Sequence, residues 1–222
     1  MAKQKLTAIE NIVLIICLLV LATGFFLFYT NVPGFENFIK EDGTVEWLTV
    51  AGLVAGSVVC LSRFTRLLRK KTKWFLFVTL FLGLFLFFAA GEEISWGQRI
   101  FGLKTPAYFE THNAQQETNL HNLVVDGVKL NKLVFSLLMV IALAIYLVVI
   151  PILYQKNYAV NKFLDNSGVP IPRLYQVIGF GVVFIATSLI KHGKNAELLE
   201  ACGASLFFLI MLMPKNKEIF RR

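Results

Sequence analysis

Long uncharged apolar runs constrain this chain more than any other feature of its sequence. Several runs are long enough to cross a bilayer, which takes about 20 helical residues at a rise of about 1.5 Å each. Of the 222 residues, 56% are hydrophobic and only 16% are charged, so a single water-soluble core could not bury the apolar side chains. The runs are continuous instead of alternating, which excludes a membrane β-barrel. The sequence therefore predicts an all-α polytopic membrane protein that forms one domain over residues 1–222.

We expect six membrane-spanning helices, with a long outer loop between the third and the fourth that itself contains helix. The predicted spans cover Ile12–Tyr29, Trp47–Leu61, Trp74–Ala90, Leu133–Leu153, Leu174–Ile190 and Leu198–Met213. Pro151 is expected to kink the fourth span, and Pro170 and Pro172 to break the chain before the fifth. Gly52 and Gly56, four residues apart, would let the second span pack closely against a neighbour, although membrane helices also tolerate Gly without that role.

The distribution of the 22 Lys and Arg residues predicts the orientation. With the N-terminus inside the cell, most of them lie on the cytoplasmic side, including the basic loop at 63–73, in agreement with the positive-inside rule. The basic residues behind the net charge of +8 are then expected to contact anionic lipid headgroups. It is not a nucleic-acid signal, because no basic face with interleaved aromatic residues lies outside the spans. We expect a multi-pass protein of a bacterial inner membrane, with both termini cytoplasmic.

The same topology places nearly all acidic residues, and all three histidines, on the outer side. Of the 14 acidic residues, only Glu10, Asp165 and Glu218 fall on the cytoplasmic side. Acidic residues have little influence on membrane orientation, so the topology does not demand this asymmetry. Ionisable groups near the ends of spans are costly and usually face the interior of the bundle. We therefore expect a polar pocket that opens toward the outer leaflet and is built from the ends of several spans.

The first of three segments that could build this pocket is GEEISWGQRIFG at 91–102, directly after the third span. Glu92 and Glu93 cannot both ionise cheaply at an apolar boundary unless a cation lies near, and Arg99 or a metal is the candidate. Trp96 would lie along the membrane interface. A solvated helix end with an interfacial Trp explains the same pattern almost as well.

The second segment is HNAQQETNLHN at 112–122. Pro106 predicts a helix that starts just after it, and Asn113 can cap a second helix. On that second helix Glu117 and His121 would be four residues apart and would share a face. A neutral imidazole beside a carboxylate suits a divalent metal, or a general base with its orienting acid. A surface ion pair is an equally good interpretation.

The third segment is KHGKNAELLE at 191–200, between the fifth and the sixth spans. Glu197 and Glu200 are three residues apart on one face at the start of the last helix. The helix dipole explains Glu197 by itself, but Glu200 lies deeper and is followed by an apolar run. Lys191 and His192 would neutralise these acids.

These strings resemble those of a family of uncharacterised bacterial polytopic membrane proteins. The strings in question are Glu-Asp-Gly-x-x-Glu at 41–46, GEEISWGQR at 91–99 and Asn-x-Gln-x-Glu-x-Asn-Leu-His-Asn at 113–122. The likeness covers nearly the whole chain. It implies that the three outer segments form one unit, and it implies no activity.

The leading interpretation is a membrane-embedded hydrolase or transferase that acts on a lipid-linked substrate at the outer leaflet and uses a divalent metal. The residues expected to bind the metal or to activate water are Glu93, Glu117, His121 and Glu200. Those expected to contact the substrate are Arg99, which is also a catalytic candidate, Lys191 and Trp96. Those expected to support them are Glu46 at the lip of the second span, Glu92, Glu197 and His192.

Two other classes of function fit the same residues. Cation or proton transport would use the outer acids as a binding site, although no ionisable residue in the inner halves of the spans continues a path. A structural or assembly subunit would dock a membrane-protein partner, or a second copy of the chain, on the outer acidic face. No phosphate-binding loop, Gly-x-Ser-x-Gly turn or His-Glu-x-x-His pair is present to decide between these classes.

Overall fold

The computed structural model describes residues 5–125, 128–129 and 138–221, and within these ranges the chain is mostly helical. Four helical stretches are long and apolar enough to cross a membrane, and they are α1 (Ala8–Thr30), α3 (Thr44–Leu67), α4 (Lys73–Glu93) and Met139–Lys156. The last stretch comprises α7 (Met139–Ala144), a π-helical turn (Ile145–Val149) and α8 (Ile150–Lys156). Two further apolar helices are shorter, α10 (Leu174–Leu189) with 16 residues and α11 (Ala196–Leu212) with 17.

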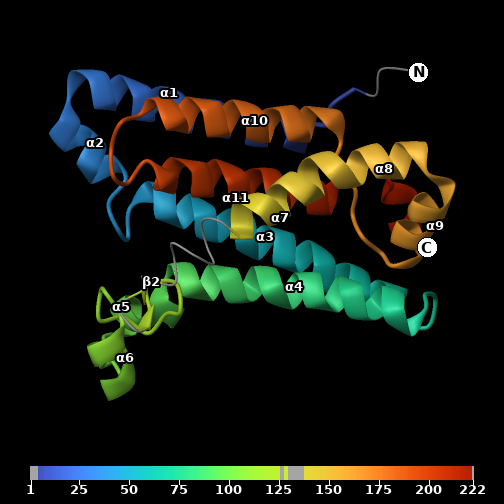
Figure 1. Cartoon of the computed structure of the whole chain (residues 1–222), viewed down its shortest axis with the longest axis horizontal. Helices are drawn as coiled ribbons and strands as arrows, with labels where there is room; N and C mark the ends of the chain where they lie inside the picture. The colour runs from blue at the N-terminus through green and yellow to red at the C-terminus, as the bar shows by residue number, and fades with distance from the viewer. Residues whose placement is uncertain (1–4, 126–127, 130–137, 222) are drawn as a thin grey trace.

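Short elements cap the two ends of this bundle. They are α2 (Val32–Phe38), a 3-10 turn (Ser95–Gly97), α5 (Gln98–Phe101), α6 (Ala107–His112), the antiparallel two-residue strands β1 (Val124–Val125) and β2 (Val128–Lys129), α9 (Tyr158–Asn166) and a second 3-10 turn (Lys217–Phe220). Figure 1 shows α2, α5 and α6 at one end, which we call the site end. The start of α1, the end of α11, and α9 lie at the opposite end, which we call the terminal end.

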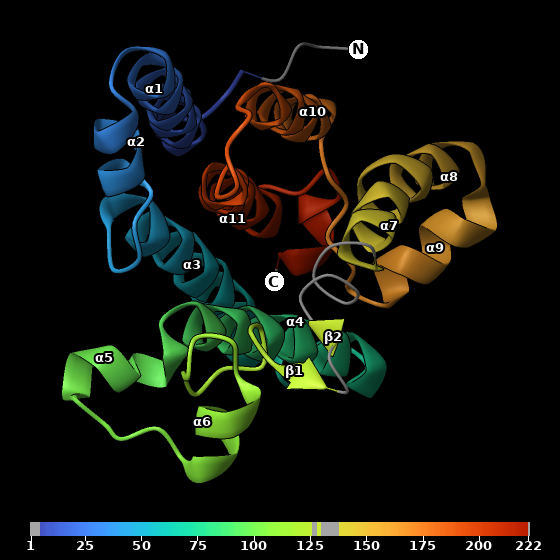
Figure 2. The same ribbon diagram turned by 60° about the vertical axis from the view of Figure 1, so that its left-hand side comes forward.

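Helix α11 runs through the centre of the bundle, where Figure 2 shows it between α1, α3 and α10. Its close approach to α3 depends on Gly52, because a Cβ atom added there would lie 2.8 Å from the carbonyl carbon of Ala204. At Gly56 an added Cβ would lie 3.1 Å from a methyl group of Leu86. The close helix packing predicted from the two glycines is therefore confirmed, and Gly52 is the position at which backbone meets backbone.

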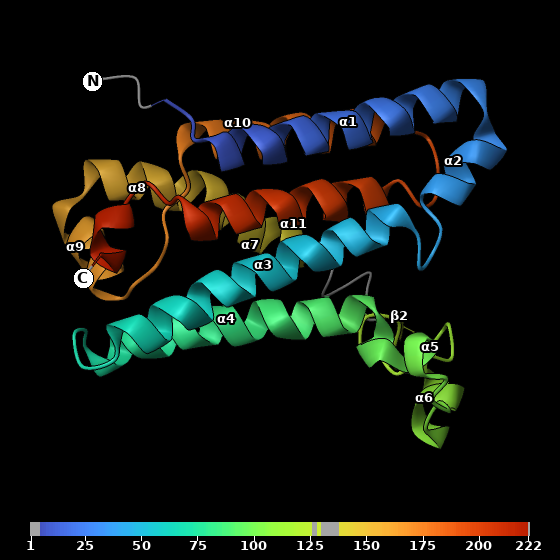
Figure 3. The same ribbon diagram turned by 180° about the vertical axis from the view of Figure 1, so that it is seen from behind.

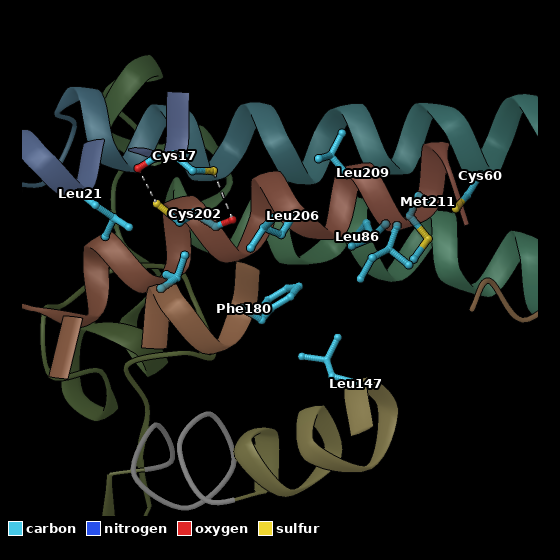
Figure 4. Packing of buried hydrophobic residues seen from close by; sticks show 12 residues of the cluster. Cys17, Leu21, Cys60, Leu86, Leu147, Phe180, Cys202, Leu206, Leu209 and Met211 are labelled. Atoms are coloured by element: carbon cyan, nitrogen blue, oxygen red, sulfur yellow. Dashed lines mark hydrogen bonds between the residues drawn. The ribbon is translucent and has the colours of Figure 1, made fainter. Parts of the chain in front are cut away.

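The interior between the two ends is apolar. Figure 4 shows Leu206 and Leu209 of α11 together with Phe180 and Leu86 from neighbouring helices. Cys17 and Cys202 are free thiols that lie side by side in this core, each with its sulfur within 4 Å of the other residue's carbonyl oxygen. The outer faces of α1 and α4 carry large exposed apolar side chains, as helices that face lipid do. Figure 3 shows these two helices on opposite sides of the bundle.

Helix α3 extends beyond the end of the second predicted span. The span was expected to stop at Leu61, but α3 continues to Leu67 and carries Arg63 into the interior, where the side chain is buried. The Arg63 guanidinium donates a 3.0 Å hydrogen bond to the carbonyl oxygen of Leu212 and lies 4.1 Å from the centre of the Phe220 ring. From the sequence, Arg63 was expected in the loop after this span. Its burial within α3 is compensated by the hydrogen bond to the end of α11 and by the contact with the Phe220 ring.

The fourth predicted span lies partly outside the described residues, since its first residues fall within 133–137. The described part contains a π-helical turn directly before Pro151. Proline has no N–H to donate and its ring crowds the preceding turn, and a π-helical turn relieves both constraints. The structure thus shows a change of helix type before Pro151, and the kink expected there stays a prediction. The chain around Pro170 and Pro172 is non-helical, as predicted.

Candidate functional site

Arg99 is the central side chain at the site end. It belongs to α5, and its guanidinium contacts three carboxylates from distant parts of the chain. Its Nε lies 2.9 Å from Asp42, one Nη lies 2.8 Å from Glu46 at the start of α3, and the other Nη bonds to Glu117. Arg99 therefore ties the first outer loop, α3 and the loop at 113–123 together through one planar fork of donors.

An unusual backbone turn directs Arg99 toward these partners. Ser95, Trp96 and Gly97 are consecutive and all have positive φ, at 47°, 54° and 76°. For Ser and Trp this left-handed conformation costs of order 1–3 kcal/mol each, so it persists only where surrounding contacts hold it. The Ser95 side chain is fully buried; its hydroxyl donates to Glu117 and accepts a 2.9 Å hydrogen bond from Asn119. The strained turn and the Arg99 fork thus share Glu117 as a partner.

Glu92 is a structural anchor. Its carboxylate accepts hydrogen bonds from the Trp96 indole at 2.9 Å and from the backbone N–H groups of Leu120 and His121 at 2.6 and 3.1 Å. These bonds fasten the loop at 113–123 onto the end of α4. Arg99, one of the two cations considered for Glu92 and Glu93, pairs with other carboxylates, and Glu92 is stabilised by neutral donors, which satisfy a buried carboxylate without a counter-charge.

The predicted second helix of the outer loop does not form. As expected, α6 starts just after Pro106, but the chain from Asn113 to Leu123 consists of turns closed by a bridge between those two residues. The Asn113 side chain accepts hydrogen bonds from the backbone of Gln115 and Glu117 and donates to Asn119. Asparagine side chains compete with helix by bonding to nearby backbone, and here that competition wins. Glu117 and the histidine four residues later therefore do not share a helical face.

A cavity of about 220 Å³ lies beside these loops and is lined from several elements. Its wall includes Glu46 from α3, Glu92 and Glu93 from the end of α4, the loop residues Gln115, Glu117, Asn119, His121 and Asn122, Arg99, and Gly193, Lys194, Ala196, Glu197 and Glu200 at the start of α11. Glu41 completes the lining at the mouth, where its carboxylate contacts the side chains of Gln115 at 2.9 Å and Lys194 at 3.3 Å. Residues far apart in the chain thus face one polar cavity that is partly open to solvent.

The carboxylates around the cavity fall into two groups. Glu41, Glu46, Glu92 and Glu117 all have hydrogen-bond or ion-pair partners. Glu93, Glu197 and Glu200 are half-buried and face the cavity, and none of the three has a hydrogen bond or ion pair within the described part of the chain. The first group therefore stabilises the loops around the cavity, and the second group is available to bind water or a ligand in it.

The charge states of two loop groups follow from their surroundings. Burial alone would lower the pKa of Arg99, but its hydrogen bond with Glu117 and the charges of Glu117, Glu46 and Asp42 outweigh burial and raise it. Arg99 is consequently cationic at every pH at which the protein is folded. Burial lowers the pKa of His121, and the charge of Glu92 offsets only part of this effect. The His121 imidazole is therefore neutral at pH 7.

Three predicted site residues lie elsewhere. Lys191 is exposed and does not line the cavity; the neighbouring Lys194 does. His192 lines a separate recess, where its Nε2 is 3.6 Å from Glu36. Trp96 is 43% exposed and holds Glu92 with its indole N–H instead of lining the cavity.

The predicted metal ligands share the cavity without forming a coordination shell. Glu93, Glu117, His121 and Glu200 all line it, yet nowhere within residues 5–125, 128–129 and 138–221 do three His, Cys, Asp or Glu side chains come close enough together to hold a metal ion. Glu117 is engaged by Arg99, Ser95 and Asn119, which keeps its oxygens from the other acids. The structure therefore brings the predicted ligands to one cavity without clustering three of them, and metal binding stays a prediction.

Residues that hold the site together escaped the sequence reasoning. Asp42, Ser95, Asn113 and Asn119 carry much of the hydrogen-bond network, and Lys194 closes the mouth. The density of amide side chains in the segment at 113–122 was the available signal, because a run of Asn and Gln is typical of a loop held by side-chain to backbone bonds.

Comparison of the chain with models of protein families, with curated proteins and with solved structures finds no match, so the site is interpreted from its own geometry.

Proposed function

We propose that the chain is a membrane-embedded hydrolase or transferase that acts on a lipid-linked substrate in the leaflet at the site end. The observation that supports this proposal is the cavity. Carboxylates from α4 and α11 that have no partner within the described part of the chain face a space bordered by the hydrogen-bond network of Arg99, Glu92 and Asn113. Polar groups that converge on one cavity are the usual setting of chemistry in a membrane protein.

In this proposal Glu93 and Glu200 act as general acid and general base. Two half-buried carboxylates that face the same cavity cannot both ionise cheaply, so one retains a proton to donate while the other accepts one from water or from a hydroxyl group. Glu197 lies one turn before Glu200 on α11 and assists it, and the neutral His121 shares the wall. Because the described residues assemble no metal site, acid–base catalysis is favoured over the metal-dependent form.

The surface beside the cavity suits a lipid-linked substrate. Trp96, Ile100 and Phe101 are 43%, 52% and 73% exposed at the site end, next to the end of α4. Exposed aromatic and aliphatic side chains at the end of a spanning helix sit at the headgroup level of a bilayer. A headgroup in the cavity would leave its acyl chains beside this apolar surface.

The apolar interior favours a reaction site over a transport path. Beyond Glu200 the core around α11 is closed by residues such as Leu206 and Leu209. The charged side chains farther along, Arg63 and the Glu10–Arg173 pair at 2.9 Å, lie at the terminal end. Ion conduction needs a chain of polar sites, and buried hydroxyls between the two ends, such as Ser57, Thr79 and Ser205, each donate to a backbone carbonyl oxygen.

We further propose six spans, with the terminal end cytoplasmic and the site end on the outer side of a bacterial inner membrane. Helices α10 and α11 would be about 24 and 26 Å long at a rise of about 1.5 Å per residue, which is short for a bilayer core of about 30 Å. Their packing against longer helices supports membrane insertion at that length. The positive-inside rule supports the orientation.

Untargeted lipid mass spectrometry tests the proposed activity. Membranes that contain the wild-type protein should convert a lipid species that is unchanged in membranes with Glu93→Gln or Glu200→Gln. We expect each substitution to reduce the conversion by at least about 100-fold, the usual effect of losing a general acid or base. A chelator should leave the activity intact.

The matched control is Glu110→Gln in α6, since Glu110 is exposed and does not line the cavity. Its lipid profile should equal that of the wild type. Identical lipid profiles for the wild type, the control and both cavity variants, at equal amounts of folded protein, would remove the proposal.

A further inference from the structure

We infer that the cavity binds a primary ammonium group, either on a lipid headgroup or on a free small amine. This inference rests on the proposed function for its setting and adds the class of ligand. It depends on three observations: the charge of the cavity wall, the absence of a partner for Glu200, and the spacing of the carboxylates.

The wall of the cavity is acidic, and its cations are already engaged. Arg99 is shared by Asp42, Glu46 and Glu117, and Lys194 contacts Glu41 at the mouth. Among the described residues no side-chain cation forms an ion pair with Glu93, Glu197 or Glu200, although the charge of Lys194 acts on Glu197 from a distance. A cationic ligand would therefore meet acidic groups that have no cation in contact with them, and an anionic ligand would be repelled.

Glu200 supplies the second observation. Its side chain is half-buried, it lines the cavity, and no hydrogen bond or ion pair reaches it from the described chain. A carboxyl group that is partly withdrawn from solvent needs a donor, because losing water without gaining a hydrogen bond costs about 1–3 kcal/mol. The donors that complete Glu200 therefore come from the contents of the cavity, either water or a ligand.

The spacing of the acids distinguishes an ammonium from a metal. A divalent cation needs several ligand oxygens within about 2.0–2.6 Å of one point, and no three described side chains are close enough together to provide this. An ammonium group bonds through three separate N–H donors at about 2.7–2.9 Å, so its acceptors can stand farther apart. Glu93 on α4, and Glu197 and Glu200 on α11, offer acceptors on two walls of one space.

The size of the cavity agrees with a small amine. A water molecule takes about 30 Å³ of liquid volume, so 220 Å³ leaves room for an aminoethyl group together with a few waters. A ligand of this kind on a lipid would enter with its amine toward Glu200 and its acyl chains toward the exposed surface at Ile100 and Phe101.

Calorimetric titration of the purified full-length protein in detergent tests this inference, with ethanolamine as the probe. We expect saturable binding at one site, at least about ten-fold weaker binding of tetramethylammonium because it has no N–H donors, and at least about ten-fold weaker binding of ethanolamine to Glu93→Gln and to Glu200→Gln. The Glu110→Gln control should bind like the wild type. Circular dichroism and thermal unfolding verify that the variants are folded.

The inference is overturned if ethanolamine does not bind saturably, if tetramethylammonium binds as tightly, if Mg²⁺ displaces ethanolamine at equal concentration, or if both cavity variants bind like the wild type. Nanodiscs identify the source of the amine. The apparent affinity for free ethanolamine is compared between phosphatidylethanolamine and phosphatidylcholine nanodiscs. If a lipid headgroup occupies the site, the affinity should be lower in phosphatidylethanolamine; if the ligand is a free amine, it should be equal in both. Both results support an ammonium ligand.

The two proposals fail separately. A lipid conversion that requires Glu200, without any competition by ethanolamine, would overturn the ammonium ligand and leave the proposed activity in place. Saturable ethanolamine binding that requires Glu200, without any lipid conversion, would uphold the ligand and remove the activity.

Discussion

Replacing Arg99 by Met should destabilise the protein more than almost any other single change at the site end. The substitution keeps an unbranched apolar stem but removes the cation that Asp42, Glu46 and Glu117 share. Three carboxylates would then lie within reach of one another without a counter-charge.

The expected loss follows from how exposed each partner is. The side chains of Glu46 and Glu117 are only 7% and 12% exposed, so removing Arg99 leaves two enclosed charges unpaired. Breaking a buried ion pair in this way typically costs about 3–5 kcal/mol. The side chain of Asp42 is 48% exposed, so its pair with Arg99 contributes at most about 1 kcal/mol. We therefore expect Arg99→Met to lower the free energy of unfolding by about 3–5 kcal/mol.

Unfolding by denaturant in detergent micelles, followed by circular dichroism, measures this loss. Arg99→Lys should give a smaller loss, because Lys keeps the charge but lacks the planar fork of donors. A triple variant with Arg99→Met, Glu46→Gln and Glu117→Gln should recover most of the stability, since it no longer encloses unpaired charge. Lowering the pH toward about 4.3, where Glu is normally half protonated, should shrink the difference between Arg99→Met and the wild type.

A loss below about 1 kcal/mol would show that the fork is not a structural element of the site. The same conclusion would follow if the triple variant were no more stable than Arg99→Met, because the carboxylates would then not be the source of the instability.

Two further predictions concern packing and pH. Gly52→Ala should lower the free energy of unfolding by about 1–3 kcal/mol, because the added Cβ would lie 2.8 Å from the backbone of Ala204. The control Gly181→Ala should not destabilise the protein, because nothing lies within 4 Å of the added atom. Equal unfolding midpoints for the two variants would contradict the close contact between α3 and α11. Burial lowers the pKa of His121 below its ordinary value of 6.5, so the unfolded chain binds its proton first as the pH falls. Stability should therefore decline below about pH 6.5 more steeply in the wild type than in His121→Gln, and parallel stability curves for the two proteins would refute a buried neutral imidazole.

Much of the fold follows from local sequence. Apolar runs of sufficient length form helices whose backbone groups are paired internally, which is the way a chain can enter lipid, so the cores of α1, α3 and α4 fall where the apolar runs predict them. Pro106 sets the start of α6, and Glu46 lies in the first turn of α3 as expected from the turn at Gly43. These features depend on residues within a few positions of one another.

The predictions that failed needed information from distant residues. Asn113 is a good helix cap by composition, but its amide and carbonyl groups bond to Asn119 and to the loop backbone instead. Arg99 was one of two candidate cations for Glu92 and Glu93, whereas the left-handed turn at 95–97 directs it to the carboxylates of Asp42, Glu46 and Glu117.

The sequence by itself determined that this is a helical protein with several helices able to cross a membrane, and it indicated which outer segments carry the ionisable groups. Only the tertiary structure decided which of those groups are consumed in holding the site and which remain open to a ligand. Hydrophobic periodicity and chain stiffness act over neighbouring residues, so they can be read from the sequence. Whether Glu117 or Glu200 has a partner depends on where α5 and α11 bring other side chains, and that depends on the packing of the whole bundle.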